Sequence, residues 1–388
     1  MNKFSFHPVG QGLFYTGSIL DGYYNFVYDC GKSINNSKFE VLVDDFTNHI
    51  QEIDFIVISH LHNDHFNGLP MLLDLCRTKK IKINKIILPY LYGFKNIAHF
   101  LLALSIFDEE VNLNSEEYMR LFYIMCGFYN GSRQNNYEIP IEFINENENK
   151  FSECVLSFPK PNNPMWKFHL INKKISYCLC KQLNLDIQDL LKLYKMNDLV
   201  QFIENYKSKA LFEIKKIYTN VLLKSNLINS VVKLNDLNLS SIVMIHYPVI
   251  KTSNTFITSE NNINYNKFYE REKYLCCKYK YINNLERTSV CLSLLTGDAK
   301  FNDDMLNYVK NLINDRSAIM QVPHHGSKNN YVQISGLFAD FNYYVISFGL
   351  GNKYNHPNSE TIDCILNSNK RAMIYEVNQL TGLYYYID

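Results

Sequence analysis

The 388-residue chain lacks the sequence features that mark several protein classes. It has no run of about 18 uncharged apolar residues, so we expect no transmembrane helix. The first residues, MNKFSFHPVGQG, contain no apolar segment of about 7–15 residues, so we expect no secretory signal peptide. The net charge is only +1, and overall charge therefore does not argue for a nucleic-acid or membrane partner.

The cysteines form no recognisable framework for metals or disulfides. There are 10 of them at irregular spacings, and no CxxC pair occurs. Such cysteines are typical of reduced thiols in a cytosolic protein. Hydrophobic residues make up 47% of the chain, which is enough for a sizeable core. We therefore expect a folded, cytoplasmic protein.

The N-terminal part alternates strand and helix patterns. The runs GLFYTGSIL and YYNFVYDC are separated by Asp-Gly, which predicts a β-hairpin. FEVLVDDFTNHIQE has apolar residues at helical spacing. IDFIVISH is a continuous apolar run and predicts a strand buried on both faces. A histidine-rich stretch follows it, where a buried strand gives way to a loop that can hold a functional site.

The rest of the chain predicts a second set of strands and three insertions. Strands are expected at 238–247 and within SVCLSLLTGDAK and SAIMQVPHHGSK. Residues 95–131 and 170–235 have helical periodicity. Residues 252–285 are polar and predict an irregular or hairpin segment. The second helical segment is rich in lysine, which is typical of a solvated helix face; the alternative is a surface that contacts phosphates.

The histidine-rich stretch, ISHLHNDHFNGLP at 58–70, has the residue types of a metal site. His60 and His62 point the same way on an extended chain because side chains alternate between faces. Asp64 and His65 come round the following turn. Imidazole suits zinc, iron or nickel, and carboxylate also accepts manganese or magnesium. One segment can thus offer ligands to two cations, which can together activate a water molecule.

Two later stretches supply the further ligands that two cations require. LLTGDAK places Asp298 at the end of a predicted buried strand, where its carboxylate could bridge the cations. VPHHGSK places His324 and His325 at the end of another strand and follows them with Ser327 and Lys328. Together they can complete the coordination and hold an anionic oxygen.

The motifs HxHxDH, TGD and PHHGS, in this order, resemble those of the metallo-β-lactamase superfamily. More narrowly, they resemble the metallo-β-lactamase-like domain of ComEC-type DNA-uptake competence proteins. VGQG at 9–12, YDCG at 28–31 and ISFGLGNKYNHPN at 346–358 match further motifs of that branch. The resemblance covers about 1–90 and 238–388 of the chain.

The resemblance implies an αββα sandwich formed by a single domain over 1–388, with the three insertions added to it. It also implies two divalent metal ions, zinc or manganese, and a role for each motif residue. His60 and His62 would bind the first metal, Asp64 and His65 the second, and Asp298 would bridge them. The likeliest further ligand by this resemblance is His324, and His325 is a ligand or proton donor. The substrate side would be lined by Ser327, Lys328, Asn355 and His356.

The sequence departs from the family pattern in three places. Many members place another metal-binding histidine after a mid-chain strand, but the equivalent CVLSFPKPNN has none. His169 or His246 could substitute for it. ComEC-type proteins also carry membrane-spanning domains, which are not expected here. The insertions have no recognised counterpart and would act as lids, walls or surfaces for a protein partner.

These features favour a metal-dependent hydrolase that acts on a nucleic acid or another phosphodiester. Asp64, His325 and Lys328 are its candidate catalytic residues. Two alternatives stay open: an enzyme for small phosphoesters or carboxylic esters, and a partner-binding module with a partial metal site. No membrane partner is expected.

Overall fold

The computed structural model describes most of the two ends of the chain and part of its middle. The described residues are 1–60, 62–89, 141–143, 151–158, 164–173, 177–197, 201–202, 205–206, 209–210, 212–213, 216–217, 241–249, 255–261, 286–288, 290–313, 316–328 and 335–387.

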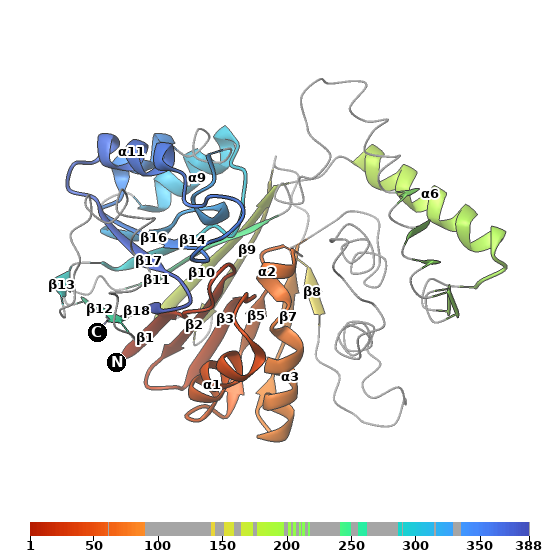
Figure 1. Ribbon diagram of the computed structural model, residues 1–388, viewed down its shortest axis with the longest axis horizontal. Helices are drawn as coiled ribbons and strands as arrows, with labels where there is room; N and C mark the ends of the chain where they lie inside the picture. The colour runs from red at the N-terminus through yellow and green to blue at the C-terminus, as the bar shows by residue number, and fades with distance from the viewer. Residues whose placement is uncertain are drawn as a thin grey trace.

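Two large β-sheets face each other at the centre of the molecule (Figure 1). The first has nine strands in the order β13-β12-β18-β1-β2-β3-β5-β7-β8, and the second has seven in the order β17-β16-β15-β14-β11-β10-β9. The strands of the first sheet are β1 (Asn2–Phe6), β2 (Phe14–Ile19), β3 (Tyr24–Cys30), β5 (Phe55–Val57), β7 (Ile86–Leu88), β8 (Ile141–Phe143), β12 (Thr255–Asn261), β13 (Glu286–Thr288) and β18 (Thr381–Ile387). Those of the second are β9 (Phe151–Phe158), β10 (Trp166–Lys173), β11 (Ile242–Pro248), β14 (Leu292–Leu295), β15 (Ala318–Gln321), β16 (Tyr343–Ser347) and β17 (Met373–Val377). The short strands β4 (Glu52–Ile53) and β6 (Lys82–Ile83) form a separate pair.

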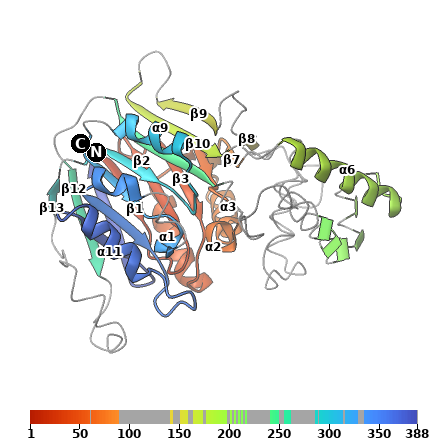
Figure 2. The same cartoon turned by 90° about the horizontal axis from the view of Figure 1, so that it is seen from above.

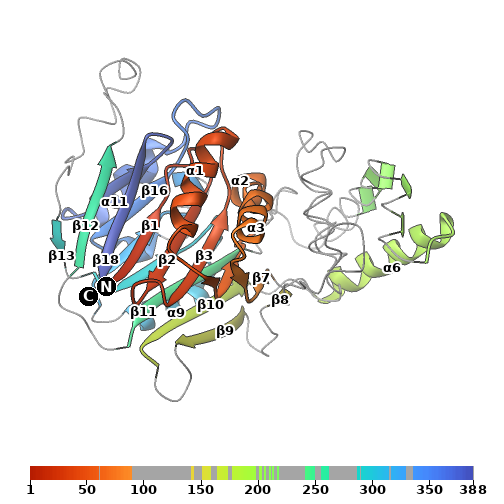
Figure 3. The same ribbon diagram turned by 90° about the horizontal axis from the view of Figure 1, so that it is seen from below.

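Helices cover the outer faces of both sheets. On the first sheet lie α1 (Asn36–Thr47) and α3 (Leu69–Thr78), and on the second lie α9 (Asp303–Ile313), α11 (Ser359–Ser368) and the 3-10 helix η5 (Ser335–Asp340). Figures 1 and 3 show these two groups of helices on opposite sides of the paired sheets. The predicted αββα sandwich is confirmed.

Strand periodicity builds the core between the sheets. In β1, Phe4 and Phe6 are fully buried and pack in that core, whereas Lys3, Ser5 and His7 point to the other face. The predicted hairpin is also present, because β2 and β3 pair as antiparallel strands across a turn that contains Asp21 and Gly22. The predicted first helix corresponds to α1, which begins where the Asn35 side chain accepts a hydrogen bond from the Lys38 amide.

A chain of hydrogen-bonded polar side chains crosses the core, and it provides partners for both ring nitrogens of the buried His246. Trp166 Nε1 donates to His246 Nδ1 (3.3 Å), so the other ring nitrogen carries the proton and donates to the Tyr15 hydroxyl (2.7 Å). Tyr15 then meets Tyr385 (2.6 Å), which meets Ser293 (2.5 Å). Burial lowers the pKa of His246 to about 3, so its ring is neutral. Every member is thereby satisfied without a metal.

Both ring nitrogens of His169 also have hydrogen-bond partners within the protein. Its two ring nitrogens lie 2.8 Å from the Tyr308 hydroxyl and 3.0 Å from the Tyr247 hydroxyl. Neither His169 nor His246 belongs to a group of candidate metal ligands in the described part of the chain. The idea that one of them replaces the missing mid-chain histidine is therefore not supported by their positions.

The insertions are only partly described. The expected helical stretch at 95–131 lies outside the described residues. The one expected at 170–235 starts later than predicted, because β10 continues to Lys173 and the helix α6 runs over Tyr177–Leu193 (Figure 2). The segment at 252–285, expected to be irregular or a hairpin, contains the strand β12, which pairs antiparallel with β13 on one side and with β18 on the other. Among the described helices, none is long and apolar enough to cross a membrane.

Tyr15→Phe tests the polar chain in the core. Removal of the hydroxyl leaves the buried His246 N–H without its acceptor, and we expect the free energy of unfolding to fall by about 1–3 kcal/mol. Urea denaturation measures this. Tyr23→Phe is the matched control, because the Tyr23 side chain is 76% exposed and the change should stay within about 0.5 kcal/mol. Equal stabilities of the two variants would contradict the assignment.

Candidate metal centre

Loops at the ends of three buried strands bring the predicted ligands together. His60 and His62 follow β5, and the short helix α2 (Asn63–Phe66) carries Asp64 and His65. Asp298 follows β14, and the turn η4 (His324–Gly326) follows β15. The side chains form two groups, and within each group the potential ligand atoms all lie within 4.8 Å of one another. One group contains His60, His62 and Asp298, and the other contains Asp64, His65 and His325.

Glycines allow the loops to approach this closely. A Cβ atom on Gly31 would lie 1.8 Å from the Asp64 carbonyl oxygen, and one on Gly12 would lie 2.8 Å from the same atom. That carbonyl also accepts a hydrogen bond from the Leu13 amide (3.1 Å). The VGQG and YDCG motifs thus hold the segment that carries Asp64 and His65.

The buried carboxylate of Asp29 orients two segments of the centre. Asp29 lies at the end of β3, is fully buried and has a φ of 58°. It accepts hydrogen bonds from the Ser59 amide (2.6 Å), the Ser59 hydroxyl (2.7 Å) and His65 Nδ1 (2.7 Å). The sequence resemblance included Asp29 within YDCG but assigned it no role. Carboxylates that hold a histidine in this way orient it for a metal.

The hydrogen bonds of His65 and His325 determine which ring nitrogen of each faces the centre. His65 Nδ1 donates to the Asp29 carboxylate, and His325 Nδ1 donates to the Ser347 carbonyl oxygen (2.7 Å). The Nε2 atoms then face other carboxylates: His65 Nε2 lies 3.2 Å from Asp298 Oδ1, and His325 Nε2 lies 3.1 Å from Asp64 Oδ2. Two lone-pair atoms at this distance repel unless a proton or a cation stands between them. Buried His65 Nε2 also makes no well-aligned hydrogen bond within the described residues, so the arrangement fits a cation.

His60 follows the same pattern. The Ser59 hydroxyl donates to Asp29, so the 3.0 Å contact between Ser59 Oγ and His60 Nδ1 requires the histidine to donate. His60 Nε2 is then an acceptor, 2.9 Å from His62 Nδ1 and 3.6 Å from Asp298 Oδ2. A cation bound by three protein ligands keeps an open position for water, as in catalytic zinc sites.

Asp298 lies between the two groups. Its Oδ1 atom faces His65, and its Oδ2 atom faces His60 and, at 3.8 Å, His324 Nε2. This is the geometry that a bridging carboxylate requires. The resemblance gave His324 as a further ligand and His325 as a ligand or proton donor, without a group for either. In the structure His325 belongs to the second group, and His324 lies on the side of the first.

The burial and close spacing of these histidines and carboxylates shift their pKa values. Burial opposes charge on all of these groups, yet Asp298 and Asp29 raise the pKa of His65 well above its usual value. Burial would raise the pKa of Asp64, but the hydrogen bond from His325 and the charge of His65 hold it far below its usual range. Burial, together with the charge of His65, lowers the pKa of His60. The lowered pKa of Asp64 and the raised pKa of His65 thus correspond to a centre in which protons lie between ligands that could share a cation.

Gln321 was missed by the sequence analysis and holds two of the loops in register. Its Oε1 atom accepts hydrogen bonds from the amides of Thr296 and Gly297 (2.8 Å each), and its Nε2 atom donates to the Gly297 carbonyl oxygen (3.2 Å). It thereby ties the turn before Asp298 to the strand that leads to His324. An isolated glutamine in the apolar run AIMQV was the available signal.

The predicted substrate-side residues lie around the same loops with different exposure. His356 is half-buried with its ring centroid 5.6 Å from that of His324, and its Nδ1 makes no hydrogen bond in the described structure. Burial lowers the pKa of His356 to about 4. Ser327 is buried, and its amide donates to the His324 carbonyl oxygen (2.8 Å). Asn355 is exposed, and the exposed Lys328 ammonium pairs with Glu360 (3.3 Å).

Part of the chain that forms this centre matches a known protein family. Residues 24–119 match the family model of the metallo-beta-lactamase superfamily. The matched segment contains Asp29 and the HxHxDH motif, whereas Asp298, His324 and His325 lie beyond it and join the centre through the fold. A comparison with curated proteins found no match.

Asp29→Asn tests the anchoring carboxylate. Asparagine has a single acceptor oxygen, and its NH2 group would face either the Ser59 amide or the Ser59 hydroxyl and His65 Nδ1, all of which donate to the carboxylate. We expect the affinity for Zn²⁺ or Mn²⁺ to fall about 10–100-fold, measured by competition with a chromogenic chelator. Asp340→Asn, at an exposed position on η5, is the control and should bind like the unaltered protein. Equal affinity of both variants would contradict the role of Asp29.

Metal binding should also release protons. Although burial lowers the pKa of His325, its hydrogen bond to Asp64 raises it above the usual value, and the pKa of His65 is raised as well. Both rings must lose a proton before they coordinate a cation, so affinity should fall as the pH is lowered. Calorimetric titrations in two buffers of different ionisation enthalpy measure the release. Heats that do not depend on the buffer would contradict it.

Proposed function

We propose that this protein is a metal-dependent hydrolase that cleaves phosphodiester bonds, with DNA or RNA as the expected substrate. The single observation that carries the hydrolase proposal is the pair of ligand groups that meet at Asp298. The match to the metallo-beta-lactamase superfamily supports it. The phosphodiester preference rests on the ComEC-like motifs and on Ser327 and Lys328 beside the centre.

The residues divide into those that hold cations and those that handle protons and charge. His60, His62 and Asp298 would hold one cation, and Asp64, His65 and His325 the other, with Asp298 shared between them. When bound, such a cation pair lowers the pKa of water toward about 7 and stabilises the attacking and leaving oxygens. Asp29 and Ser59 keep the ring nitrogens of His65 and His60 aimed at the centre.

The substrate would contact the more exposed side of the centre. There, the buried Nδ1 atom of His356 has no hydrogen-bond partner among the described residues, and a turn of the ring would bring it to a substrate oxygen. The ammonium group of Lys328 would have to leave Glu360 to meet a phosphate oxygen, and that surface pair is weak enough to be exchanged. Asp64 is 31% exposed at its side chain and hydrogen-bonds to His325, so this pair can hold and pass on a proton.

Asp64→Asn tests the activity. The amide removes one anionic ligand and the partner of His325, and we expect cleavage to fall at least about 100-fold. The assay follows single- and double-stranded DNA, RNA and bis(p-nitrophenyl) phosphate with Mn²⁺ or Zn²⁺. Asp340→Asn is again the control and should keep the activity of the unaltered protein, as it lies outside the centre.

The same assay separates the alternatives. Cleavage of p-nitrophenyl phosphate or acetate without cleavage of any phosphodiester would replace the proposal by a small-ester hydrolase. Less than one metal ion per purified chain, with no activity on any substrate, would favour a partner-binding module instead. Cleavage of a phosphodiester that Asp64→Asn leaves unchanged would refute the assignment of the centre.

A further inference from the structure

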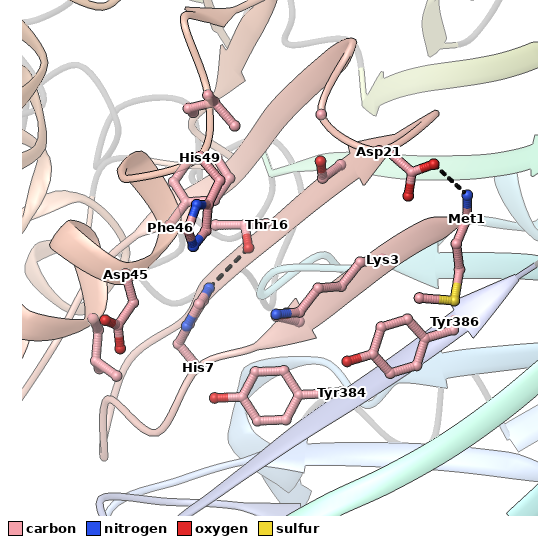
Figure 4. Close-up of a pocket in the computed structure, with 15 residues that line it drawn as sticks. Met1, Lys3, His7, Thr16, Asp21, Asp45, Phe46, His49, Tyr384 and Tyr386 are labelled. Carbon is pink, nitrogen blue, oxygen red and sulfur yellow. Dashed lines mark hydrogen bonds and ion pairs between the residues drawn. The ribbon is translucent and has the colours of Figure 1, made fainter.

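A cavity lies on the outer face of the first sheet (Figure 4), and none of the candidate metal ligands lines it. Its floor is formed by the outward side chains of β1, β2 and β18, and one wall by α1. Its volume is about 520 Å³, within the usual range of roughly 300–1,000 Å³ for small-molecule sites. The proposed hydrolysis makes no use of it.

The floor carries polar groups because the strands alternate. Lys3 and Ser5 of β1 and His7, which directly follows it, line the cavity, while their neighbours Phe4 and Phe6 fill the core. Thr16 of β2 and Tyr384 of β18 lie on either side of them. If water alone covered this face of the sheet, there would be no structural reason for a lysine, hydroxyl groups and a buried histidine to lie together there.

His7 is the group that points to a ligand. It is only 6% exposed and lines the cavity, with one ring nitrogen, Nε2, 2.8 Å from the Thr16 hydroxyl. Its Nδ1 atom is buried and makes no hydrogen bond to any described residue. A buried polar atom without a partner is costly, and a bound molecule would satisfy it.

Lys3 makes this end of the cavity positive. Burial and, to a smaller extent, the charge of Lys3 lower the pKa of His7 to about 3, so its ring is neutral. The Lys3 ammonium lies 5.4 Å from the centre of the Tyr384 ring and has no ion-pair partner among the described residues. In Figure 4 the Lys3 ammonium, the His7 ring and the Tyr384 hydroxyl lie around the same space. An oxyanion there would meet a charge and two hydrogen-bonding groups.

The walls suit a flat ring. Phe46 of α1 and Tyr384 of β18 stand on opposite sides of the cavity, and Tyr386 extends the aromatic surface along the strand (Figure 4). Aromatic side chains bind planar groups by stacking and by edge contacts.

Two carboxylates line the cavity. That of Asp21 lies at the far end and is paired with the N-terminal ammonium (3.1 Å). That of Asp45 on α1 lies on the side of His7 that is away from Lys3 (Figure 4), so an anion would bind on the Lys3 side.

We propose that this cavity is a second ligand site that binds a small molecule with a flat ring and an oxyanion, the oxyanion lying against Lys3 and His7. The ring would lie between Phe46 and the tyrosines of β18. The site is independent of the proposed hydrolase activity, since it shares no residue with the metal centre.

Calorimetry with AMP tests the proposal, with adenosine and inorganic phosphate as the ring alone and the oxyanion alone. The protein is treated with a chelator, and His60→Ala is measured in parallel to remove binding at the metal centre. We expect AMP to bind more tightly than either fragment and equally well to His60→Ala. Lys3→Met should weaken AMP binding at least about 10-fold, because a charge-assisted contact is lost. Lys38→Met, at an exposed position of α1 outside the cavity, should not.

Three results would overturn the proposal. The first is the absence of millimolar or tighter binding for AMP, phenyl phosphate and benzoate alike. The second is binding that survives Lys3→Met and is lost in His60→Ala, which would place the anion at the metal centre. The third is adenosine binding as tightly as AMP, which would remove the oxyanion from the recognition. None of these results depends on whether the protein hydrolyses a substrate.

Discussion

The candidate centre depends on the hydrogen bonds that the buried Asp29 carboxylate accepts from Ser59 and His65. Through His65 it acts directly, and through Ser59 it determines which nitrogen of His60 is free to coordinate. Burial raises the pKa of Asp29, and the charge of His65 and these hydrogen bonds oppose the rise. One carboxylate therefore orients ligands of both cation groups, and the ligands are aimed at the centre before any cation arrives.

Close backbone approach makes this arrangement sterically feasible. The glycines of VGQG and YDCG leave room for the Asp64 carbonyl oxygen, and Gly297, with a φ of 51°, leaves room for the Ser59 hydroxyl 2.6 Å from where its Cβ would lie. Gln321 then ties the Asp298 turn to the neighbouring strand. The centre is built on the ends of packed strands, which hold side chains more precisely than free loops do.

The two faces of the first sheet serve different purposes because strand side chains alternate. The inner face of β1 and β2 contributes aromatic rings to the core. It also contributes Tyr15, which hydrogen-bonds to His246 in the polar chain. The outer face of the same strands carries the polar cavity around Lys3 and His7. The sandwich thus separates the candidate metal centre at the strand ends from the proposed small-molecule site on the sheet face.

Local pattern was sufficient to predict the hairpin and α1 and to select the candidate ligands in HxHxDH, TGD and PHHGS, since these depend on periodicity and on residue types within short segments. The αββα class was predicted from the resemblance of these motifs, in their order, to those of the metallo-β-lactamase superfamily. Local pattern did not reveal Asp29 as the anchor, Gln321 as the tie between loops, the positions of His325 in the second group and His324 beside the first, or the full hydrogen bonding of His169 and His246. Each of these depends on partners tens to hundreds of residues away, and only the packing of the two sheets brings those partners within hydrogen-bonding distance.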